Sequence, residues 1–420
     1  MAATLKEIYV YAHWAPMAEP LLMGKLYSEL LRGKEVFSFE YHKGWLQSGF
    51  AQSLDPDLLL YSGPQYLNDE KPNFGLFLDS SPDRWGQLLM RRREAALARK
   101  EDRKPKRLFA TDYLLGVYDG HRMGALRFKE DPEGPFLNDN REMASPPWAS
   151  LRKLQEVSLN LEQEDAARDP AYLKWLNLLI APGSSLGGAR PKASILDPKD
   201  HLWIAKFPSR NDLKDVGAWE KVAHDLAMQC GINLAEAQVQ KFTGQHHTFL
   251  TKRFDRSPGN KRIHFASAMT LLGHTDGYDS AGGASYLELA EFLMSEGAEV
   301  ERDLEELWRR IVFSICISNT DDHLRNHGFI LTAKGWRLSP AYDINPVENG
   351  TGLSLNISED DNALDLDLAR KVAPYFRLQD KTATKFIDQT LKVVAGWPKV
   401  AAQYRISRDE REHMTSAFLS

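Results

Sequence analysis

Cysteine is scarce in this chain, and a long apolar run is missing. The two cysteines, Cys230 and Cys316, are too few for a disulfide framework, and each falls on an apolar helical face, so we expect plain core residues. No uncharged apolar run reaches the length of about 18 residues that a membrane helix needs. The N-terminal MAATLKEIYVYAHW shows no basic segment followed by an apolar one, as a secretion signal would. We therefore expect a protein of the reducing cytoplasm, neither secreted nor membrane-spanning.

An excess of basic residues is missing as well. Lys and Arg number 53 against 58 Asp and Glu, and the net charge of -5 gives no global reason to bind nucleic acid. With 43% hydrophobic and 26% charged residues in 420, the chain is long enough for two or three ordinary cores. The composition therefore indicates a multidomain globular protein.

One stretch departs from this acidic background. From Arg91 to Arg107, RRREAALARKEDRKPKR contains nine basic and three acidic residues. A solvated helix end that runs into a linker is one interpretation. The other is a patch that a polyanion or an acidic partner would recognise.

The order of patterns along the chain predicts a small α/β module followed by a larger unit. Strand-like KEIYVYAHW and EVFSFEYHKGWL come first, and a helix is expected to begin near Asp83. Residues 130–148, EDPEGPFLNDNREMASPPW, hold four prolines among acidic and small polar residues, which is loop composition. We place a candidate boundary there.

The larger unit opens with a glycine-rich segment, APGSSLGGARPKASILDPKDHLWIAKFPS. Residues 183–187, GSSLG, match the G-x-S-x-G pattern of a hydrolase nucleophile elbow, but that elbow needs a helix directly after its serine. Gly187, Gly188 and Pro191 oppose a helix there. The sequence instead predicts two strands, 192–196 and 201–207, joined by a turn at Asp197-Pro198. A glycine-rich loop before a hairpin either cradles phosphate oxygens with its backbone N–H groups or is an ordinary flexible loop.

Lys206 favours the phosphate interpretation because it ends a strand of apolar residues and must find an anion or point back to water. A helix is predicted over 217–230, where Gly231 supplies a stop and Glu220 flanks the apolar stripe. HTFLTKRFDR then reads as a strand that runs into a polar connector. Glycine-rich loop, strand lysine, helical glutamate and connector follow one another as in the ATP-binding lobe of a kinase.

The stretch NTDDHLRNHGFI, residues 319–330, follows an amphipathic helix predicted within ERDLEELWRRIVFSICISNT. Asp321 and Asn326 have the spacing of a kinase catalytic loop, in which the aspartate accepts the hydroxyl proton and the asparagine holds magnesium. A hairpin is predicted next, with Lys334-Gly335 in its turn, and we expect its second strand to end at Asp343. That carboxylate would be a second magnesium ligand.

Each of these residues also has a simpler explanation, in loop solvation, a core histidine or a turn. Their joint order favours phosphoryl transfer. A metal hydrolase built on Asp322 and His323 is disfavoured, because no second histidine lies four residues along a helix and no cysteine pair supports zinc.

Several segments of the chain resemble those of a known family. GSSLGGARPK, WIAKFPS, TKRFDR, NTDDHLRN and AYDINP are similar to segments of the HipA-like serine/threonine kinases, which are toxins of bacterial toxin–antitoxin pairs. FGLFLDSSPDRWG, residues 74–86, is similar to their N-terminal module. The resemblance implies an α+β, two-lobed, protein-kinase-like fold with a small N-terminal α/β subdomain and a mostly helical C-terminal lobe. It divides the chain into an N-terminal module (1–128), an ATP-binding lobe (149–256) and a helical catalytic lobe (257–420).

The resemblance also implies roles for single residues, with ATP and Mg²⁺ as cofactors. Asp321 would be the catalytic base, Asn326 and Asp343 metal ligands, and Ser185 the loop serine that such kinases autophosphorylate. The implied ATP contacts are Ser185, Gly187, Gly188, Ala189, Lys192, Lys206, Lys252, Phe254, His323 and Asn326. Lys252 replaces the acidic residue expected before Arg253-Phe254-Asp255, which leaves backbone contacts to adenine in place but not the side-chain one.

Known members of the family phosphorylate aminoacyl-tRNA synthetases and are neutralised by a helix-turn-helix antitoxin, HipB-like, that binds DNA. The resemblance therefore implies such a substrate and such a partner, and contact with DNA only through the antitoxin. Two hypotheses remain: an active kinase, or a kinase-shaped module without turnover in an antitoxin–DNA complex. The joint presence of Lys206, Asp321, Asn326 and Asp343 favours the first.

Overall fold

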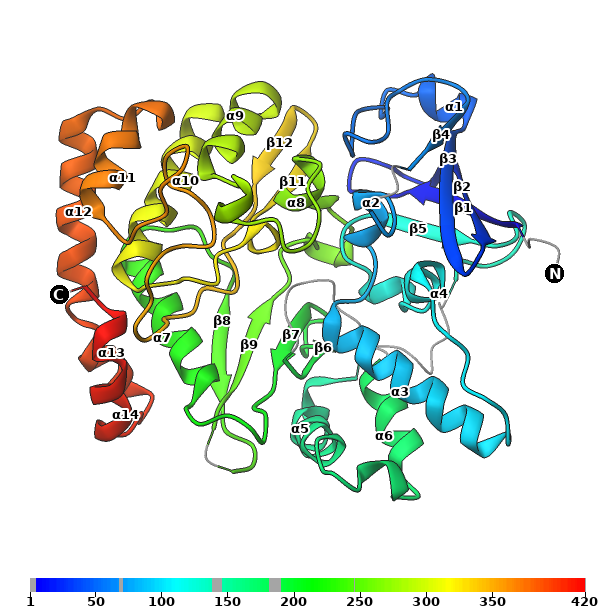
Figure 1. Cartoon of the computed structure of the whole chain (residues 1–420), viewed down its shortest axis with the longest axis horizontal. Helices are drawn as coiled ribbons and strands as arrows, with labels where there is room; N and C mark the ends of the chain where they lie inside the picture. The colour runs from blue at the N-terminus through cyan, green and yellow to red at the C-terminus, as the bar shows by residue number, and fades with distance from the viewer. Residues whose placement is uncertain (1–4, 68–70, 138–145, 181–189, 245, 420) are drawn as a thin grey trace. The chain divides into compact units, whose positions relative to one another are not determined.

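A computed structural model describes residues 5–67, 71–137, 146–180, 190–244 and 246–419 (Figure 1). The chain forms two compact units. Unit 1 consists of Met1–Arg210 and Asp255–Ala266, and unit 2 of Asn211–Phe254 and Ser267–Ser420. Among the described residues, no helix has both the length and the apolar character needed to cross a membrane.

Unit 1 begins with an antiparallel sheet in the order β4-β3-β2-β1-β5. Its strands are β1 (Leu5–Ala12), β2 (Leu21–Leu31), β3 (Lys34–Tyr41), β4 (Pro64–Tyr66) and β5 (Leu126–Lys129). Alternate residues are buried, and Ile8, Leu26 and Phe39 face one another across three strands because the register places them side by side. The predicted strand over 35–46 ends at Tyr41, and its last residues form the short helix α1 (Lys43–Leu46).

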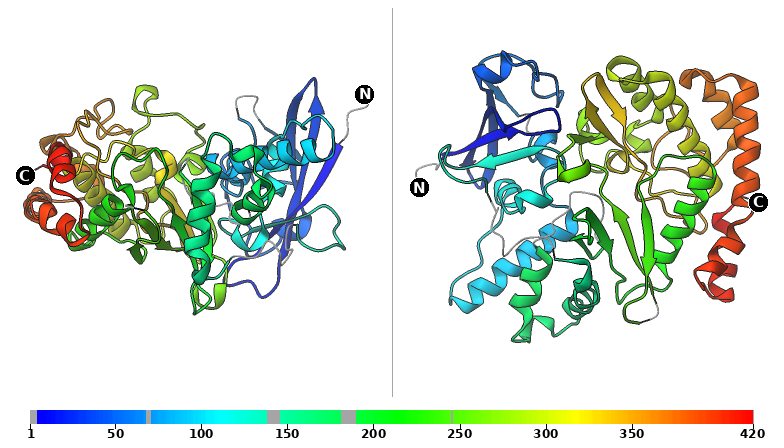
Figure 2. Two further views of the ribbon diagram at one scale, coloured as in Figure 1. Left: turned by 90° about the horizontal axis from the view of Figure 1, so that it is seen from below. Right: turned by 180° about the vertical axis from the view of Figure 1, so that it is seen from behind.

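Two helices cover the buried face of this sheet, α2 (Gly75–Leu78) and α4 (Ala110–Leu115) (Figure 2). The Phe77 ring of α2 lies 5.7 Å from that of Phe39 and 6.1 Å from that of Phe128. The Thr111 hydroxyl of α4 donates to Ser28 Oγ at 3.0 Å. One apolar face is thereby removed from water.

The remaining elements of unit 1 are α3 (Arg84–Lys100), α5 (Leu151–Leu161), α6 (Tyr172–Ile180), β6 (Lys192–Leu196) and β7 (Leu202–Lys206). The prediction of a helix near Asp83 is confirmed, since Asp83 caps α3 by accepting from Gly86 N at 2.8 Å. The prediction of two strands after the glycine-rich segment is confirmed by the antiparallel pair β6 and β7. Segment 255–266 is held in unit 1 by Asp255, whose carboxylate accepts from Gly124 N at 2.9 Å.

Unit 2 is mostly helical. Its helices are α7 (Val216–Gln229), α8 (Ala268–Leu271), α9 (Tyr286–Glu296), α10 (Val300–Cys316), α11 (Leu366–Val372), α12 (Asp380–Val394), α13 (Trp397–Gln403) and α14 (Arg408–His413). Its strands include β8 (Ala237–Gln240), β9 (Thr248–Lys252), β11 (Gly328–Thr332) and β12 (Gly335–Leu338). The first two residues of β10 (Phe265–Ser267) are assigned to unit 1 and Ser267 to unit 2.

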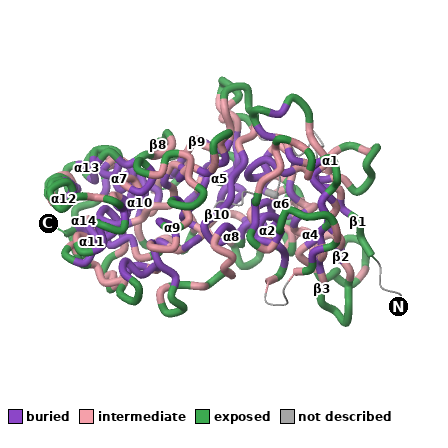
Figure 3. Tube along the Cα trace, turned by 90° about the horizontal axis from the view of Figure 1, so that it is seen from above, coloured by how far each residue is buried: buried purple, intermediate pink, exposed green. Residues whose placement is uncertain are grey.

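Helix α10 is the central core element of unit 2. Most of its residues from Leu304 to Cys316 are buried, whereas α12 keeps an exposed side (Figure 3). The predicted helix stop after α7 is present, because Gly231 adopts a φ of 79° that favours glycine. Cys230 and Cys316 are buried and free, as expected from their apolar surroundings.

Candidate active site

The candidate active site is built on the loop that follows α10. The helix ends at Cys316, Ser318 turns the chain with a φ of 49°, and Asn319 N donates back to the Ser314 carbonyl at 2.9 Å. This tight turn delivers Asp321 to the surface, where its side chain is 78% exposed. Asp321 is therefore accessible to an incoming hydroxyl group.

Asp322, the next residue, has the opposite environment and anchors the loop. Its side chain is buried, and its carboxylate accepts hydrogen bonds from the Tyr286 hydroxyl of α9 and, at 3.3 Å, from the Ser314 hydroxyl of α10. His327 Nε2 forms an ion pair with it at 2.8 Å. Burial raises the pKa of Asp322, but the charge and hydrogen bond of His327 and the hydrogen bond from Tyr286 outweigh burial and hold the pKa below its ordinary value. Asp322 thus ties two helices to the start of β11.

Asn326 is positioned five residues after Asp321 in a short 3₁₀ turn, Leu324–Asn326. Its Nδ2 donates to the Asp321 carbonyl at 2.8 Å, which fixes the side-chain amide and closes the loop. Its Oδ1 is buried and has no hydrogen-bond partner among the described residues. A buried amide oxygen without a donor is costly, so this atom is suited to a ligand such as a hard cation.

His323 lies between these two residues and is part-exposed. Its Nε2 is 4.0 Å from the Asp321 carboxylate. Its Nδ1 is buried and has no hydrogen-bond partner within the described part of the chain. The prediction that His323 contacts ATP stays a prediction.

Asp343 lies beyond the end of its hairpin, which corrects one expectation. Strand β12 ends at Leu338 and does not reach Asp343, because Pro340 has no N–H for a ladder and Ala341 N instead donates to the Asn233 carbonyl at 2.8 Å. Asp343 has a φ of 57°, a left-handed conformation that is strained for a residue with a side chain.

The neighbours of Asp343 hold it against the loop that follows α10. The Tyr342 hydroxyl donates to the Arg325 carbonyl at 2.8 Å, next to Asn326. Two residues after Asp343, Asn345 N donates to Asn319 Oδ1 at 3.1 Å. The segment that carries Asp343 is therefore fastened to the loop that carries Asp321 and Asn326.

The residues present fit a magnesium ion. Mg²⁺ takes oxygen ligands and usually keeps water and substrate phosphates, so that one or two protein groups are enough. The Asn326 amide and the Asp343 carboxylate are oxygen donors of this kind. Among the described residues, no group of three or more His, Cys, Asp or Glu side chains is arranged to hold a metal ion.

Two further predicted contacts of ATP lie in unit 2. Phe254 packs its ring 5.6 Å from that of Tyr342, so it adjoins the segment that leads to Asp343. Lys252 ends β9, where its backbone N donates to the Glu236 carbonyl at 2.8 Å. Phe254 is thus brought near the loop through Tyr342.

The remaining predicted contacts belong to unit 1 or lie outside the described residues. Lys192 and Lys206 are direct partners across the β6–β7 pair. Lys192 is only 2% exposed, and its Nζ is 2.7 Å from the carboxylate of Asp83, itself buried. The Asp83 carboxylate neutralises the charge of Lys192, which gives this lysine a structural role. The predicted contact of Lys192 with ATP stays a prediction. Ser185, Gly187, Gly188 and Ala189 lie outside the described residues.

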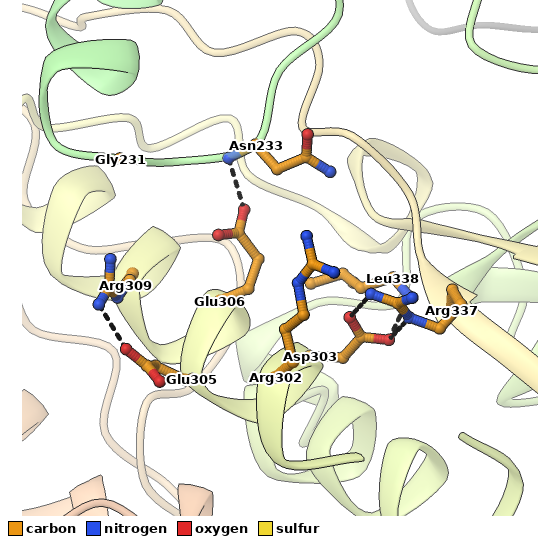
Figure 4. Close-up of a pocket in the computed structure, with 9 residues that line it drawn as sticks. All are labelled: Gly231, Asn233, Arg302, Asp303, Glu305, Glu306, Arg309, Arg337 and Leu338. Carbon is orange, nitrogen blue, oxygen red and sulfur yellow. Dashed lines mark hydrogen bonds and ion pairs between the residues drawn. The ribbon is translucent and has the colours of Figure 1, made fainter. Parts of the chain in front are cut away.

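A pocket of about 220 Å³ in unit 2 has a different character (Figure 4). It is lined by Gly231, Asn233, Arg302, Asp303, Glu305, Glu306, Arg309, Arg337 and Leu338. Two ion pairs lie within it: Arg337 donates to Asp303 at 2.7 and 3.0 Å, and Arg309 binds Glu305. Asp303 also accepts from Leu338 N at 3.0 Å. These contacts fasten β12 to α10 upstream of Asp343.

The residues that support the loop were not identified from the sequence. Asp322 resembled a solvated loop residue, and Tyr286 lies 36 positions before it. The one signal was the sharp change from charged to apolar residues after His327, which places a histidine at the start of a buried strand. Such a histidine needs a partner, and Asp322 is the acid that the fold supplies.

Comparison with known proteins gives a consistent result. Residues 184–397 match a family model described as the HipA-like C-terminal domain. A Haemophilus influenzae protein named "Putative kinase" is 27% identical over 179 residues, which is 38% of this chain and 52% of that protein. A Sinorhizobium fredii protein named "Putative kinase Y4mE" is 27% identical over 149 residues, 34% of this chain and 33% of that protein. The matches thus span about half and one third of these relatives.

A solved structure matches nearly the whole chain. It belongs to the Shewanella oneidensis complex of the toxin–antitoxin proteins HipA and HipB with their operator DNA, with a TM-score of 0.65 and 18% identity. The match covers 99% of this chain and 95% of that one. The predicted α+β, two-lobed, protein-kinase-like fold is thereby confirmed.

Proposed function

The chain belongs to the family defined by the HipA-like C-terminal domain, and from this membership we propose that it is an ATP- and Mg²⁺-dependent serine/threonine protein kinase. One observation carries the proposal. An exposed carboxylate, Asp321, and a buried amide oxygen without a donor, Asn326 Oδ1, lie on one loop that is closed by their own hydrogen bond. Both relatives described above are named as kinases, which supports phosphoryl transfer as the reaction class.

Asp321 would accept the proton of the acceptor hydroxyl as phosphoryl transfer proceeds. The exposed position lets a protein substrate reach it, and the anchored Asp322 fixes the backbone from which it projects. Asn326 Oδ1 and the Asp343 carboxylate would hold Mg²⁺, which neutralises phosphate charge when bound. Lys206, at the end of β7, is the proposed contact to the ATP phosphates.

The substitution Asp321→Asn tests the base directly. It keeps the shape of the side chain but removes the charge that accepts the proton, so phosphoryl transfer should fall by about 10²-fold or more. ATP binding by calorimetry should persist. The matched control is Asp360→Asn, another exposed carboxylate of unit 2, which should leave the rate unchanged. Near wild-type transfer from radiolabelled ATP by Asp321→Asn would show that Asp321 is not the base.

Ser185 is the proposed autophosphorylation site and off switch. A phosphoryl group adds a charge of about −1.5 to −2, and its repulsion from ATP phosphates beside the same loop should abolish nucleotide binding. We expect phosphosite mass spectrometry to find the modification in Ser184→Ala but not in Ser185→Ala. Ser185→Asp should lose measurable ATP binding. Tight ATP binding by protein fully phosphorylated at Ser185 would contradict the switch and leave the kinase assignment intact.

The proposed biological role is that of a growth-arresting toxin with a HipB-like helix-turn-helix antitoxin as its partner and an aminoacyl-tRNA synthetase as its substrate. The match to a chain of the complex with HipB and operator DNA supports the partner. The competing function is an inert module in an antitoxin–DNA complex. A wild-type chain that binds an antitoxin but transfers no phosphate to itself or to any of a panel of synthetases would favour that module.

A further inference from the structure

The basic stretch predicted from the sequence separates into two parts in the structure. The first three arginines sit within α3, where Arg91 donates to the Tyr113 hydroxyl at 3.3 Å and Arg92 donates to the Leu161 carbonyl at 3.0 Å. The second part, Arg99–Arg107, begins in the last turn of α3 and continues as the connection toward α4 (Figure 1). We call this second part the α3 end.

One arginine shapes the α3 end. Arg103 binds the carboxylates of Glu94 at 2.5 Å and Glu101 at 2.6 Å, and Glu94 also accepts from Lys106 N at 2.8 Å. The hydrogen bond from Arg103 lowers the pKa of Glu94, with that from Lys106 N as a second cause. These contacts hold the connection against α3 and neutralise the charge of Arg103.

The other basic residues of the α3 end point to solvent. Arg99, Lys100, Lys104, Lys106 and Arg107 are all exposed. Within the described part of the chain none of them forms an ion pair, and Arg107 lies over the Phe109 ring at 5.0 Å. Of the two acids in the α3 end, Glu101 is bound to Arg103, which leaves only Asp102 as an opposing charge. A strong positive patch thus stands on a chain whose net charge is -5.

The composition of this patch distinguishes between two kinds of partner. Protein interfaces depend on buried aromatic or apolar anchors, with charges at the rim. The exposed residues of the α3 end are charged, apart from Pro105, and include no aromatic or aliphatic anchor. Contacts to a phosphate backbone need only cations, and lysine is a compact point charge suited to phosphate without fixed geometry.

We propose that the α3 end binds the phosphate backbone of a nucleic acid directly and without base specificity. The proposal goes beyond the proposed function, in which contact with DNA comes only through an antitoxin. It does not depend on kinase activity, because the patch lies wholly in unit 1 and includes no residue of the candidate active site.

The test uses the full chain carrying Asp321→Asn, without ATP or antitoxin, and a fluorescent DNA duplex of roughly 20 base pairs and arbitrary sequence. Affinity is measured by anisotropy between about 50 and 200 mM salt. The variant Lys104→Ala/Lys106→Ala/Arg107→Ala should bind at least tenfold more weakly at the lowest salt. Its slope of log affinity against log salt should be shallower by about 3, since each lost phosphate contact removes about 0.9.

Two control variants separate the effect of the α3 end from that of the net charge of the chain. Lys381→Ala/Lys385→Ala/Lys392→Ala removes three exposed lysines of α12 and should keep the parent affinity and slope. Lys104→Arg/Lys106→Arg keeps the charge and should also bind normally. Equal losses in the α12 variant, no measurable binding by the parent, or no effect of the first triple variant would each overturn the proposal. Tighter binding of poly-glutamate than of DNA would assign the α3 end to an acidic protein instead.

Discussion

Asp321 and Asp322 are identical in chemistry and adjacent in the chain, yet the fold gives them opposite tasks. The side chain of Asp321 is 78% exposed and that of Asp322 is 7% exposed. The proposed role of Asp321 as a base requires a fixed backbone, and the contacts of Asp322 with α9, α10 and His327 hold that backbone in place. The sequence predicts Asp321 as the base from its spacing to Asn326. It does not predict the anchor, because Tyr286 and Ser314 reach Asp322 only in the folded chain.

The anchor gives a stability that depends on pH. Burial raises the pKa of Asp322, but His327 and the hydrogen bonds bring the pKa below its ordinary value of 3.8. The carboxylate therefore stabilises the folded state above about pH 4. This stabilisation is lost as the pH falls through the lower pKa of the folded state. Asp322→Asn should therefore lower the free energy of unfolding by about 3 kcal/mol at neutral pH. The difference from wild type should shrink near pH 3.

Urea denaturation at the two pH values measures this effect. Asp321→Asn is the matched control, and its free energy of unfolding should stay within about 0.5 kcal/mol of wild type because the side chain is exposed. An equal loss by Asp322→Asn at both pH values would show that the charge of Asp322 does not stabilise the fold.

At the scale of elements, the sequence predicts the bounds of a strand or helix well where nearby residues, such as a turn, mark its ends. β6 was predicted with its observed bounds, and β7 differs from its prediction by one residue at each end, because Asp197-Pro198 marks the turn between two apolar runs. The end of β12 was wrong because it depends on Asn233, more than a hundred positions away, which takes the N–H of Ala341. Partners that distant leave no local pattern.

The β6–β7 turn offers a test at this scale. The Asp197 carboxylate accepts from Lys199 N, His201 N and Trp203 Nε1 at 2.8 to 3.0 Å. Asp197→Ala leaves these donors unpaired and should lower the free energy of unfolding by about 2 kcal/mol or more. Lys199→Ala removes an exposed side chain from the same turn while keeping its N–H, and should have almost no effect. Similar denaturation midpoints for wild type and Asp197→Ala would show that this carboxylate does not stabilise the turn.

At the scale of the whole molecule, the region that defines the family does not form a unit by itself. The family match begins at residue 184, whereas Lys192 is buried against Asp83, at the start of α3. The predicted N-terminal module and the hairpin of the predicted ATP-binding lobe therefore share unit 1. A buried ion pair between residues so far apart cannot be inferred from either stretch alone.

A double-mutant cycle measures this link. Asp83→Ala removes the carboxylate that lies 2.7 Å from the buried Lys192 Nζ and also removes the cap of α3, so it should cost about 3 to 5 kcal/mol. Lys192→Met should cost less, because Asp83 still accepts from Gly86 N. The double variant should be more stable than the sum of the single losses by at least about 1 kcal/mol. Strict additivity in urea denaturation would mean that the two residues are not energetically coupled.

The two buried cysteines make the chain convenient for site-specific labelling. Burial raises the pKa of Cys230 to about 11, and burial with the nearby Cys230 raises the pKa of Cys316 to about 12. Maleimides react with the thiolate, which is scarce at neutral pH in such surroundings. A cysteine introduced at exposed Lys106 would then carry a dye in the otherwise native sequence, and the dye would report on whatever approaches the α3 end.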